Sequence, residues 1–161
     1  MTVKNREYDK SLWGRGEWDN EPDRIDFIHA GFSCMMLRNM MGAWCGYVGV
    51  PNTHPAYGVD CNNYDTPAVG NLNVHGGLTY SSLCSGTICH TPQEGMPDDV
   101  WWLGFDTGHH MDVSPLDIGR MLRDTFDPGF TNGEYGTYKN VEYVTNEVKS
   151  LADQLKEMGT K

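Results

Sequence analysis

The chain lacks positive charge through its middle. Residues 29–119 contain one cationic side chain, Arg38, against eight acidic ones, and the whole chain carries a net charge of −10. Nucleic-acid backbones are bound by cationic surfaces, so direct DNA or RNA recognition is not expected. The composition favours cations, protein partners, or a small ligand whose charge is met by Arg38, backbone N–H groups, a metal or the chain ends.

Long apolar runs are also missing. No stretch approaches the roughly 20 residues of a membrane-spanning helix, and the first twenty residues are charged and contain tryptophan rather than a basic segment followed by an apolar one. Neither a membrane span nor a secretion signal is expected. These absences predict a cytoplasmic protein.

The cysteine count is odd and the spacing is irregular, so a disulfide framework is not expected and reduced thiols are predicted. The five residues are Cys34, Cys45, Cys61, Cys84 and Cys89. Cys84, Cys89 and His90 are residue types that bind zinc, but their spacing matches no common zinc motif. The favoured interpretation is that these thiols are buried or have no functional role, with a zinc site at Cys84, Cys89 and His90 as the alternative.

The 161 residues predict a single domain, residues 1–161, with one long amphipathic helix near its end. Six apolar residues recur there at steps of three and four: Val141, Val144, Val148, Leu151, Leu155 and Met158. This spacing predicts a helix over 137–158, with Thr137 as N-cap and Gly159 as C-cap. Such a stripe packs against the chain's own sheet, or, as the alternative, forms a coiled-coil homodimer.

Four stretches have the pattern of strands. Residues 34–38 and 44–50 predict a hairpin that turns at Gly42, residues 72–80 alternate around a glycine pair, and residues 100–105 predict a central strand. Residues 1–28 are interpreted as an N-terminal strap, and 116–124 as a short helix. The predicted fold is α+β: an antiparallel or mixed sheet of about four to five strands with long loops and the C-terminal helix packed on it.

The candidate site begins in the alternating segment 72–80. Alternation places His75 and Thr79 on one face, and Gly76 and Gly77 remove side chains next to the imidazole. Glycines at such a position allow a ligand or another backbone to approach closely, which predicts a pocket. A β-bulge is the equally weighted alternative.

The second half of the site follows the apolar run 100–105. Asp106, His109 and Asp112 recur at three-residue intervals directly after it, where side chains are rigidly positioned yet reachable by solvent. With His75 these residues make four potential ligands for a divalent metal. The alternative is structural: Asp106 caps the following turn and His109 pairs with it.

Two functions are open for this site. As a catalyst it would hydrolyse a phosphoester or amide, with His75 or His109 as general base beside Asp106, or through a metal-bound water. As a binding pocket it would hold a small ligand. The predicted ligand-binding residues are His75, Gly76, Gly77, Thr79, Asp106, Arg38 and Trp102.

Several stretches, taken in order, resemble a family of small uncharacterised proteins of tailed phages and some bacteria. They are Trp44-Cys-Gly-Tyr-Val-Gly-Val50, His54-Pro55, Val74-His-Gly-Gly-Leu-Thr-Tyr80, Trp101-Trp-Leu-Gly-Phe-Asp106 with His109, and Leu151-Ala-Asp-Gln-Leu155. The resemblance implies no established reaction, so no catalytic role is transferred. The family pattern has one histidine where this chain has His109 and His110, which leaves open which imidazole points inward.

A phage origin favours accessory roles, by analogy. Three functions are therefore predicted as alternatives. The first is capture of a small, nucleotide-like ligand, including a host signal molecule, in the cytoplasm of the host cell, either within one subunit or between two. The second is a metal-dependent hydrolase, and the third is an acidic protein that inhibits a host enzyme.

Overall fold

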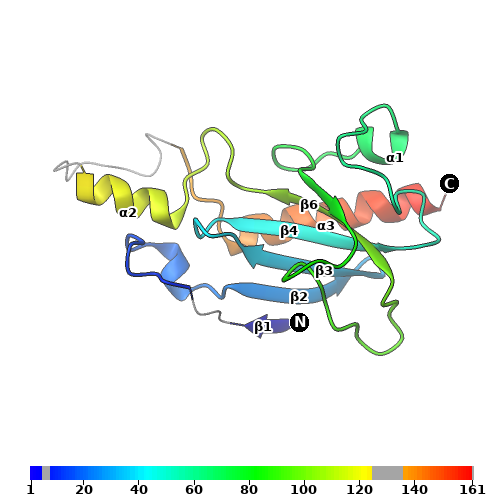
Figure 1. Cartoon of the computed structure of the whole chain (residues 1–161), viewed down its shortest axis with the longest axis horizontal. Helices are drawn as coiled ribbons and strands as arrows, with labels where there is room; N and C mark the ends of the chain where they lie inside the picture. The colour runs from blue at the N-terminus through cyan, green and yellow to red at the C-terminus, as the bar shows by residue number, and fades with distance from the viewer. Residues whose placement is uncertain (5–7, 125–135, 161) are drawn as a thin grey trace.

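A computed structural model describes residues 1–4, 8–124 and 136–160, and it is built on one six-stranded sheet (Figure 1). The strands are β1 (Thr2–Lys4), β2 (Arg24–His29), β3 (Phe32–Arg38), β4 (Trp44–Pro51), β5 (Tyr80–Ser82) and β6 (Val100–Asp106). Their order is β1-β2-β3-β4-β6-β5, with every neighbouring pair antiparallel. The predicted α+β class is confirmed, with more strands than the four to five expected.

The helices are α1 (Pro67–Gly70), α2 (Pro115–Asp124) and α3 (Val141–Gly159), and a 3-10 turn spans Glu17–Asn20. The predicted short helix near 116–124 corresponds to α2. None of the helices in the described ranges is both long and apolar enough to cross a membrane.

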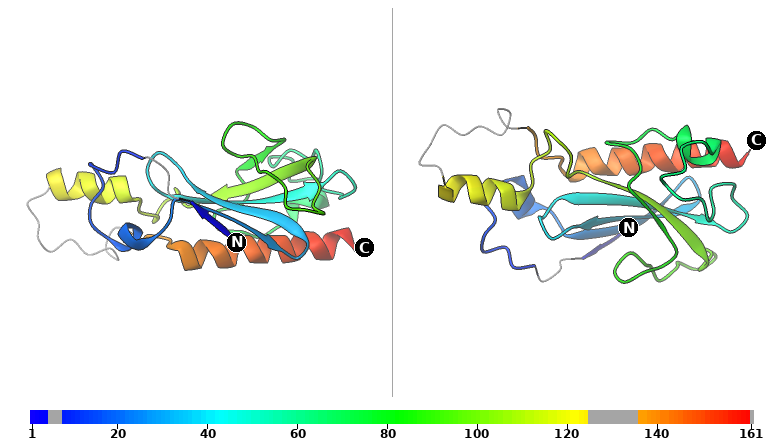
Figure 2. Two further views of the ribbon diagram at one scale, coloured as in Figure 1. Left: turned by 90° about the horizontal axis from the view of Figure 1, so that it is seen from below. Right: turned by 45° about the horizontal axis from the view of Figure 1, so that its top comes forward.

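Helix α3 lies along one face of the sheet, over β2, β3 and β4, as two further views show (Figure 2). Four residues of its predicted stripe are fully buried: Val144, Val148, Leu151 and Leu155. Burying an aliphatic side chain of this size contributes about 1.5–3 kcal/mol, which holds the helix on the sheet. The stripe therefore packs on the chain's own sheet, as predicted.

The ends of α3 differ by a few residues from the prediction. Asn140, not Thr137, is the N-cap, and its side-chain oxygen accepts a hydrogen bond from the Tyr143 N–H at 2.9 Å. Gly159 is the last helical residue, and Thr160 follows as the C-cap. The helix begins at Val141, the first residue of the stripe, because the side-chain cap is supplied by Asn140 and not three residues earlier.

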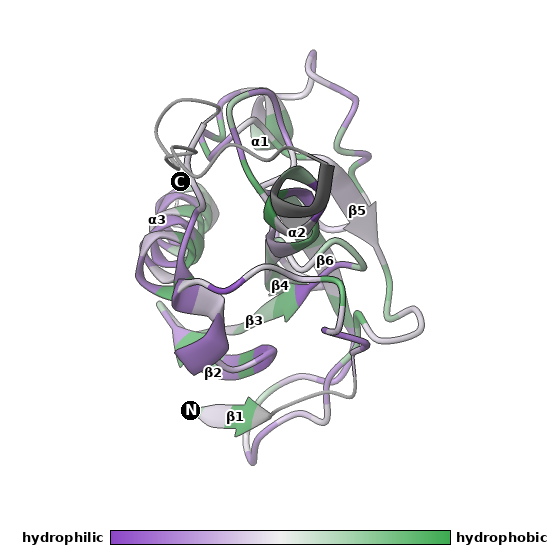
Figure 3. Ribbon diagram, turned by 90° about the vertical axis from the view of Figure 1, so that its left-hand side faces the viewer, coloured by the Kyte–Doolittle hydropathy of each residue, from purple (hydrophilic) through white to green (hydrophobic). Residues whose placement is uncertain are grey.

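Apolar side chains fill both faces of the sheet. The larger core lies between the sheet and α3, and the end-on view shows α3 beside the sheet with hydrophilic colour on its outer side (Figure 3). A second, smaller core lies on the other face. It contains Met35, Leu37, Cys45, Tyr47, Val100 and Trp102.

The predicted hairpin between β3 and β4 is confirmed. Gly42 has a φ of +83°, a left-handed conformation that favours glycine. The Asn39 side chain accepts hydrogen bonds from the backbone N–H groups of Met41 and Ala43, each at 3.0 Å. These contacts close the turn and fix the pairing of Arg38 with Trp44.

The segment predicted as an N-terminal strap contributes to the sheet itself. It contains β1 and β2, and Ile25 and Phe27 of β2 are buried in the core against α3. Arg24 and Asp26, on the other side of β2, form an ion pair at 2.8 Å. A strand with paired charges on its outer side has little of the apolar character that marked the other strands.

The prediction of a strand over 72–80 is wrong except at its end, because only Tyr80–Ser82 forms β5. Gly76 and Gly77 have φ values of +67° and +81°, and the Gly77 N–H donates to the Val74 carbonyl at 2.9 Å. These conformations make a tight turn. The alternation of apolar residues is present, but the backbone cannot extend through this glycine pair.

The prediction that all five cysteines are reduced is also wrong. Cys84 and Cys89, in the connection between β5 and β6, form a disulfide, whereas Cys34, Cys45 and Cys61 are buried free thiols. This pairing removes the thiolates that a zinc site at Cys84 and Cys89 would need. Arg24 binds the same loop, because its guanidinium donates to the carbonyl oxygens of Thr87 and Cys89 at 2.8 and 2.7 Å.

Reducing the Cys84–Cys89 disulfide is expected to lower the free energy of unfolding by about 2 kcal/mol, since the loop that it closes is short. Urea unfolding with and without dithiothreitol measures the change. A variant in which Cys84 and Cys89 are both replaced by serine provides the control, because the reductant should have no further effect on it. Equal stability of the oxidised and reduced protein would contradict the prediction.

Candidate functional site

The turn at Gly76 and Gly77 brings His75 against the loop that follows β6. A Cβ atom at Gly76 would lie 2.2 Å from His109 Nε2, so only glycine allows this approach. Space at Gly77 is open. The glycine pair therefore matches neither predicted alternative, the pocket or the β-bulge. It makes a turn rather than a β-bulge, and the His109 imidazole occupies the space beside Gly76 where a pocket was predicted.

His75 is held at both ring nitrogens. Its Nε2 lies 2.7 Å from Asp112 Oδ2, and its Nδ1 lies 2.8 Å from the Tyr143 hydroxyl. Its backbone N–H donates to Glu147 Oε2 at 2.8 Å. Burial, together with the carboxylates of Glu147 and Asp112, raises the pKa of Tyr143, so its hydroxyl keeps its proton at neutral pH.

Both ring nitrogens of His75 are therefore engaged, Nε2 with the Asp112 carboxylate and Nδ1 with the Tyr143 hydroxyl. Because both ring nitrogens are engaged, His75 has no free lone pair for a substrate in this arrangement. Its geometry suits a positioning group better than the general base considered above.

Asp112 is the centre of a polar cluster, with only 3% of its side chain exposed. The members of this cluster, called the His75 cluster below, are His75, Asp106, His109, Asp112, Lys139, Tyr143 and Glu147. Besides His75, it binds the Lys139 ammonium at 2.9 Å and accepts from the His109 backbone N–H at 3.0 Å. Burial alone raises the pKa of Asp112, but the hydrogen bonds from His75, Lys139 and the His109 N–H outweigh it and hold that pKa below its usual value. Asp112 is therefore an ionised, buried anchor.

The backbone before Asp112 is folded tightly to allow this. Met111 has a φ of +70°, uncommon for a residue with a side chain, and the Asp112 N–H donates to the His109 carbonyl at 2.9 Å. The loop thereby turns Asp112 inward. Left-handed conformations of this kind persist where surrounding contacts hold them, often at functional sites.

Asp106 and His109 form the more exposed half of the cluster, each with about a third of its side chain accessible. Asp106 accepts from the Thr79 hydroxyl and from the Gly108 N–H, both at 2.9 Å. His109 Nε2 lies 3.4 Å from Asp106 Oδ1, too far for a good hydrogen bond, and this buried atom has no hydrogen-bond partner among the described residues. His110 is exposed, so His109 is the imidazole that points inward.

A hollow of about 300 Å³ adjoins the cluster and shares Asp106 with it. It lies between the β3–β4 turn, the loop after β6 and the start of α2. Its polar lining residues are Asn39, Asp106, Thr107, Ser114 and Asp117. Asp106 therefore faces both the histidine cluster and a space large enough for a small ligand.

The described residues do not form the predicted metal centre. His75, Asp106, His109 and Asp112 lie close together, but within residues 1–4, 8–124 and 136–160 no group of three or more His, Cys, Asp or Glu side chains is arranged to hold a metal ion. The reason is local: His75 and Asp112 bind each other, and Lys139 occupies the remaining oxygen of Asp112.

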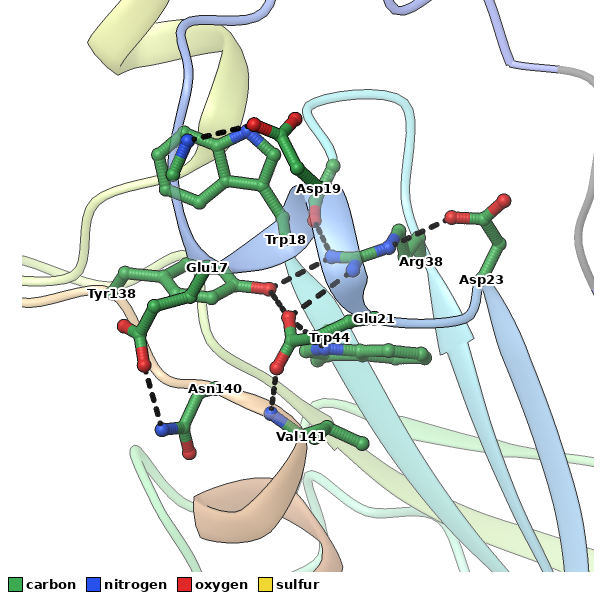
Figure 4. A network of polar contacts seen from close by, with 12 residues as sticks. Glu17, Trp18, Asp19, Glu21, Asp23, Arg38, Trp44, Tyr138, Asn140 and Val141 are labelled. Carbon is green, nitrogen blue, oxygen red and sulfur yellow. Dashed lines mark hydrogen bonds and ion pairs between the residues drawn. The ribbon is translucent and has the colours of Figure 1, made fainter.

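Arg38 and Trp102, predicted as ligand-binding residues, belong to other parts of the molecule. Arg38 is buried in a polar network with Glu21, Asp23 and Tyr138 (Figure 4). Trp102 is fully buried in the smaller core. The inclusion of both in the pocket is therefore corrected.

Three members of the cluster were not predicted as site residues. Lys139 precedes α3, and Tyr143 and Glu147 lie in its first two turns. In the sequence they read as ordinary solvent-facing positions of an amphipathic helix. Only the position of α3 beside the 75–79 turn shows that they face His75.

Comparisons of the chain with protein-family models, with curated proteins and with solved structures find no match. The resemblance to small phage proteins remains a prediction.

Proposed function

We propose that the protein binds a small, nucleotide-like ligand at the hollow beside Asp106. The observation that carries the proposal is the position of this carboxylate. It is held by Thr79 and Gly108, remains a third exposed, and borders both a 300 Å³ space and the unpartnered His109 Nε2. A positioned carboxylate with free surface in a concave site is a typical anchor for ligand N–H or O–H groups.

The charge of the site narrows the class of ligand. Two carboxylates line the hollow, Asp106 and Asp117, and no Lys, Arg or His is among its lining residues, all of which lie in the described part of the chain. Lys139 is already paired with Asp112. A phosphate would be repelled here, so the base and sugar of the ligand would contact the site while any phosphate pointed outward.

The biological role proposed with this binding is that of a phage-type accessory protein that sequesters a host signal molecule. It rests on the resemblance described above and on the charge distribution, which disfavours nucleic acid itself. A metal-dependent hydrolase is less favoured because the candidate ligands bind one another. The third function, inhibition of a host enzyme, has no specific contact in its favour.

Titration with nucleosides and their 5′-monophosphates, followed by calorimetry, tests the proposal. At least one nucleoside should bind, and Asp106→Asn should weaken that binding about ten- to hundredfold, as expected when a hydrogen bond to a charged group is lost. The amide keeps an oxygen that can accept from Thr79, so the fold should be retained.

Asp65→Asn is the matched control, because Asp65 is an exposed aspartate in another loop, and it should leave binding unchanged. The absence of binding by every nucleoside would overturn the proposal. So would tighter binding of the monophosphates that Asp106→Asn does not weaken, since it would place the phosphate, and not the base and sugar, in contact with the protein.

A further inference from the structure

A second cavity, of about 190 Å³, lies on the opposite side of the sheet from α3. Side chains of β2 and β3 form its floor, and the loop that follows the disulfide forms its roof. The polar side chains that line it are Arg24, Asp26, Ser33, His90, Thr91 and Gln93. None of these residues belongs to the His75 cluster or to the hollow beside Asp106, so this is a separate place in the fold.

His90 carries an unmet hydrogen-bonding group at this cavity. Its Nε2 atom is buried without a hydrogen-bond partner in the part of the chain that the structure describes. The ring packs edge-to-face on Trp102 with the centroids 5.0 Å apart, and Trp102 Nε1 is likewise buried and unpartnered. A buried polar atom without a partner destabilises the fold, and a molecule in the cavity that hydrogen-bonds to it removes this cost.

The roof over the cavity is firmly held. Two nitrogens of Arg24 bind Asp26 at 2.8 and 2.9 Å, and the same guanidinium donates to the Thr87 and Cys89 carbonyls. The Cys84–Cys89 disulfide closes the loop just before His90. Because the walls are positioned before anything binds, little ordering would be needed on binding.

The charges at this cavity are already matched. Arg24 and Asp26 neutralise each other. Burial lowers the pKa of His90 despite the nearby carboxylates of Asp98 and Asp26, so the imidazole is uncharged at neutral pH. An ion in the cavity would therefore find no free partner charge, whereas a neutral molecule with several hydroxyl groups could both donate and accept.

We propose that this cavity binds an uncharged polyhydroxyl molecule about the size of a single sugar ring. The ligand hydroxyls would face His90 Nε2, the Ser33 and Thr91 hydroxyls and the Gln93 amide. The volume of about 190 Å³ equals that of about six waters at ~30 Å³ each, which one sugar ring would displace.

Saturation-transfer NMR with glucose, galactose, ribose and N-acetylglucosamine tests this site, followed by calorimetry with whichever sugar binds. The wild-type protein should bind at least one of them. His90→Phe keeps a ring against Trp102 but removes Nε2, and it should raise the Kd at least tenfold. Gln93→Leu, at an exposed position, should raise it several-fold.

Two controls separate this site from the rest of the molecule. His110→Phe makes the same exchange at an exposed histidine, and Asp106→Asn alters the first proposed site. Both should leave sugar binding unchanged. If no sugar binds, and a crystal structure shows only waters beside His90 Nε2, the inference is overturned. It is also overturned if a sugar binds equally well to His90→Phe and Gln93→Leu.

Discussion

Replacing Arg38 with methionine is expected to lower the free energy of unfolding by about 3–5 kcal/mol, enough to unfold a large share of a marginally stable domain. The Arg38 side chain is fully buried, as is Asp23, and Glu21 is 8% exposed. Arg38 binds Asp23 at 3.1 Å and Glu21 at 3.2 Å. Methionine would remove the cation that pairs with the buried Glu21 carboxylate, and would leave Lys10 as the cation paired with Asp23.

The network around Arg38 explains the size of this effect. Its guanidinium also donates to the Gly42 carbonyl and the Tyr138 hydroxyl, at 2.8 and 2.9 Å, and lies 4.3 Å from the Trp44 ring centroid. Glu21 in turn accepts from the backbone N–H of Val141, the first residue of α3, at 2.6 Å. Figure 4 shows this network joining β3, the segment before β2 and the start of α3.

Urea unfolding measures the effect of Arg38→Met. Arg38→Lys should recover only part of the loss, because lysine keeps the charge but not the planar set of donors. Adding Glu21→Gln to Arg38→Met should also recover part, since one uncompensated carboxylate is then removed. Arg15→Met is the control: Arg15 is 95% exposed, so no measurable change is expected. An Arg38→Met protein as stable as wild type would show that the network contributes nothing net.

Features of the fold encoded by local periodicity were predictable. The burial of Val144, Val148, Leu151 and Leu155 follows from a 3.6-residue repeat that any α-helix imposes. The turn at Gly42 follows from a glycine between two apolar runs. Such patterns depend on near neighbours in the sequence, so they need no knowledge of the rest of the chain.

Two strand assignments failed for opposite physical reasons. In 72–80 the apolar alternation is present, but the left-handed backbone of Gly76 and Gly77 interrupts it. In β2 the backbone is extended, but Arg24 and Asp26 make the outer face polar because they bind each other and the 84–89 loop. Hydropathy reports which side chains are buried, and it reports backbone conformation only indirectly.

The candidate site was predictable only in part. Asp106, His109 and Asp112 follow one strand and could be grouped by spacing alone. The contacts of His75 with Asp112 and Tyr143 join positions separated by 37 and 68 residues. They depend on how α3 lies across β2, β3 and β4, which the sequence pattern of the helix does not specify. For the same reason the sequence could not show that the Arg38 guanidinium is buried and hydrogen-bonded in a structural network.

Asp112→Asn is expected to lower the free energy of unfolding at pH 7 by about 2–4 kcal/mol, the range for buried hydrogen bonds to a charged group. An asparagine amide would place an N–H₂ group against donors, since His75 Nε2, the His109 N–H and Lys139 all donate to Asp112. Lys139, whose side chain is 15% exposed, would also lose its counter-charge.

The pH dependence of this loss distinguishes a charge effect from a packing effect. The pKa of Asp112 in the folded protein is held below its ordinary value, so its stabilising contribution is complete above the unfolded pKa of about 3.9 and is lost as the pH falls through the folded pKa. The difference between wild type and Asp112→Asn should therefore be the same at pH 7 and pH 5.5, and smaller at pH 3.

Urea unfolding of both proteins at the three pH values checks this, with Asp65→Asn as the exposed control that should match wild type throughout. A difference that stays constant down to pH 3 would mean that the amide only disturbs packing. A difference near zero at pH 7 would mean that Asp112 does not anchor the cluster. In that case the orientation of His75 and the fold of the 106–112 loop, on which the ligand site beside Asp106 depends, would need another explanation.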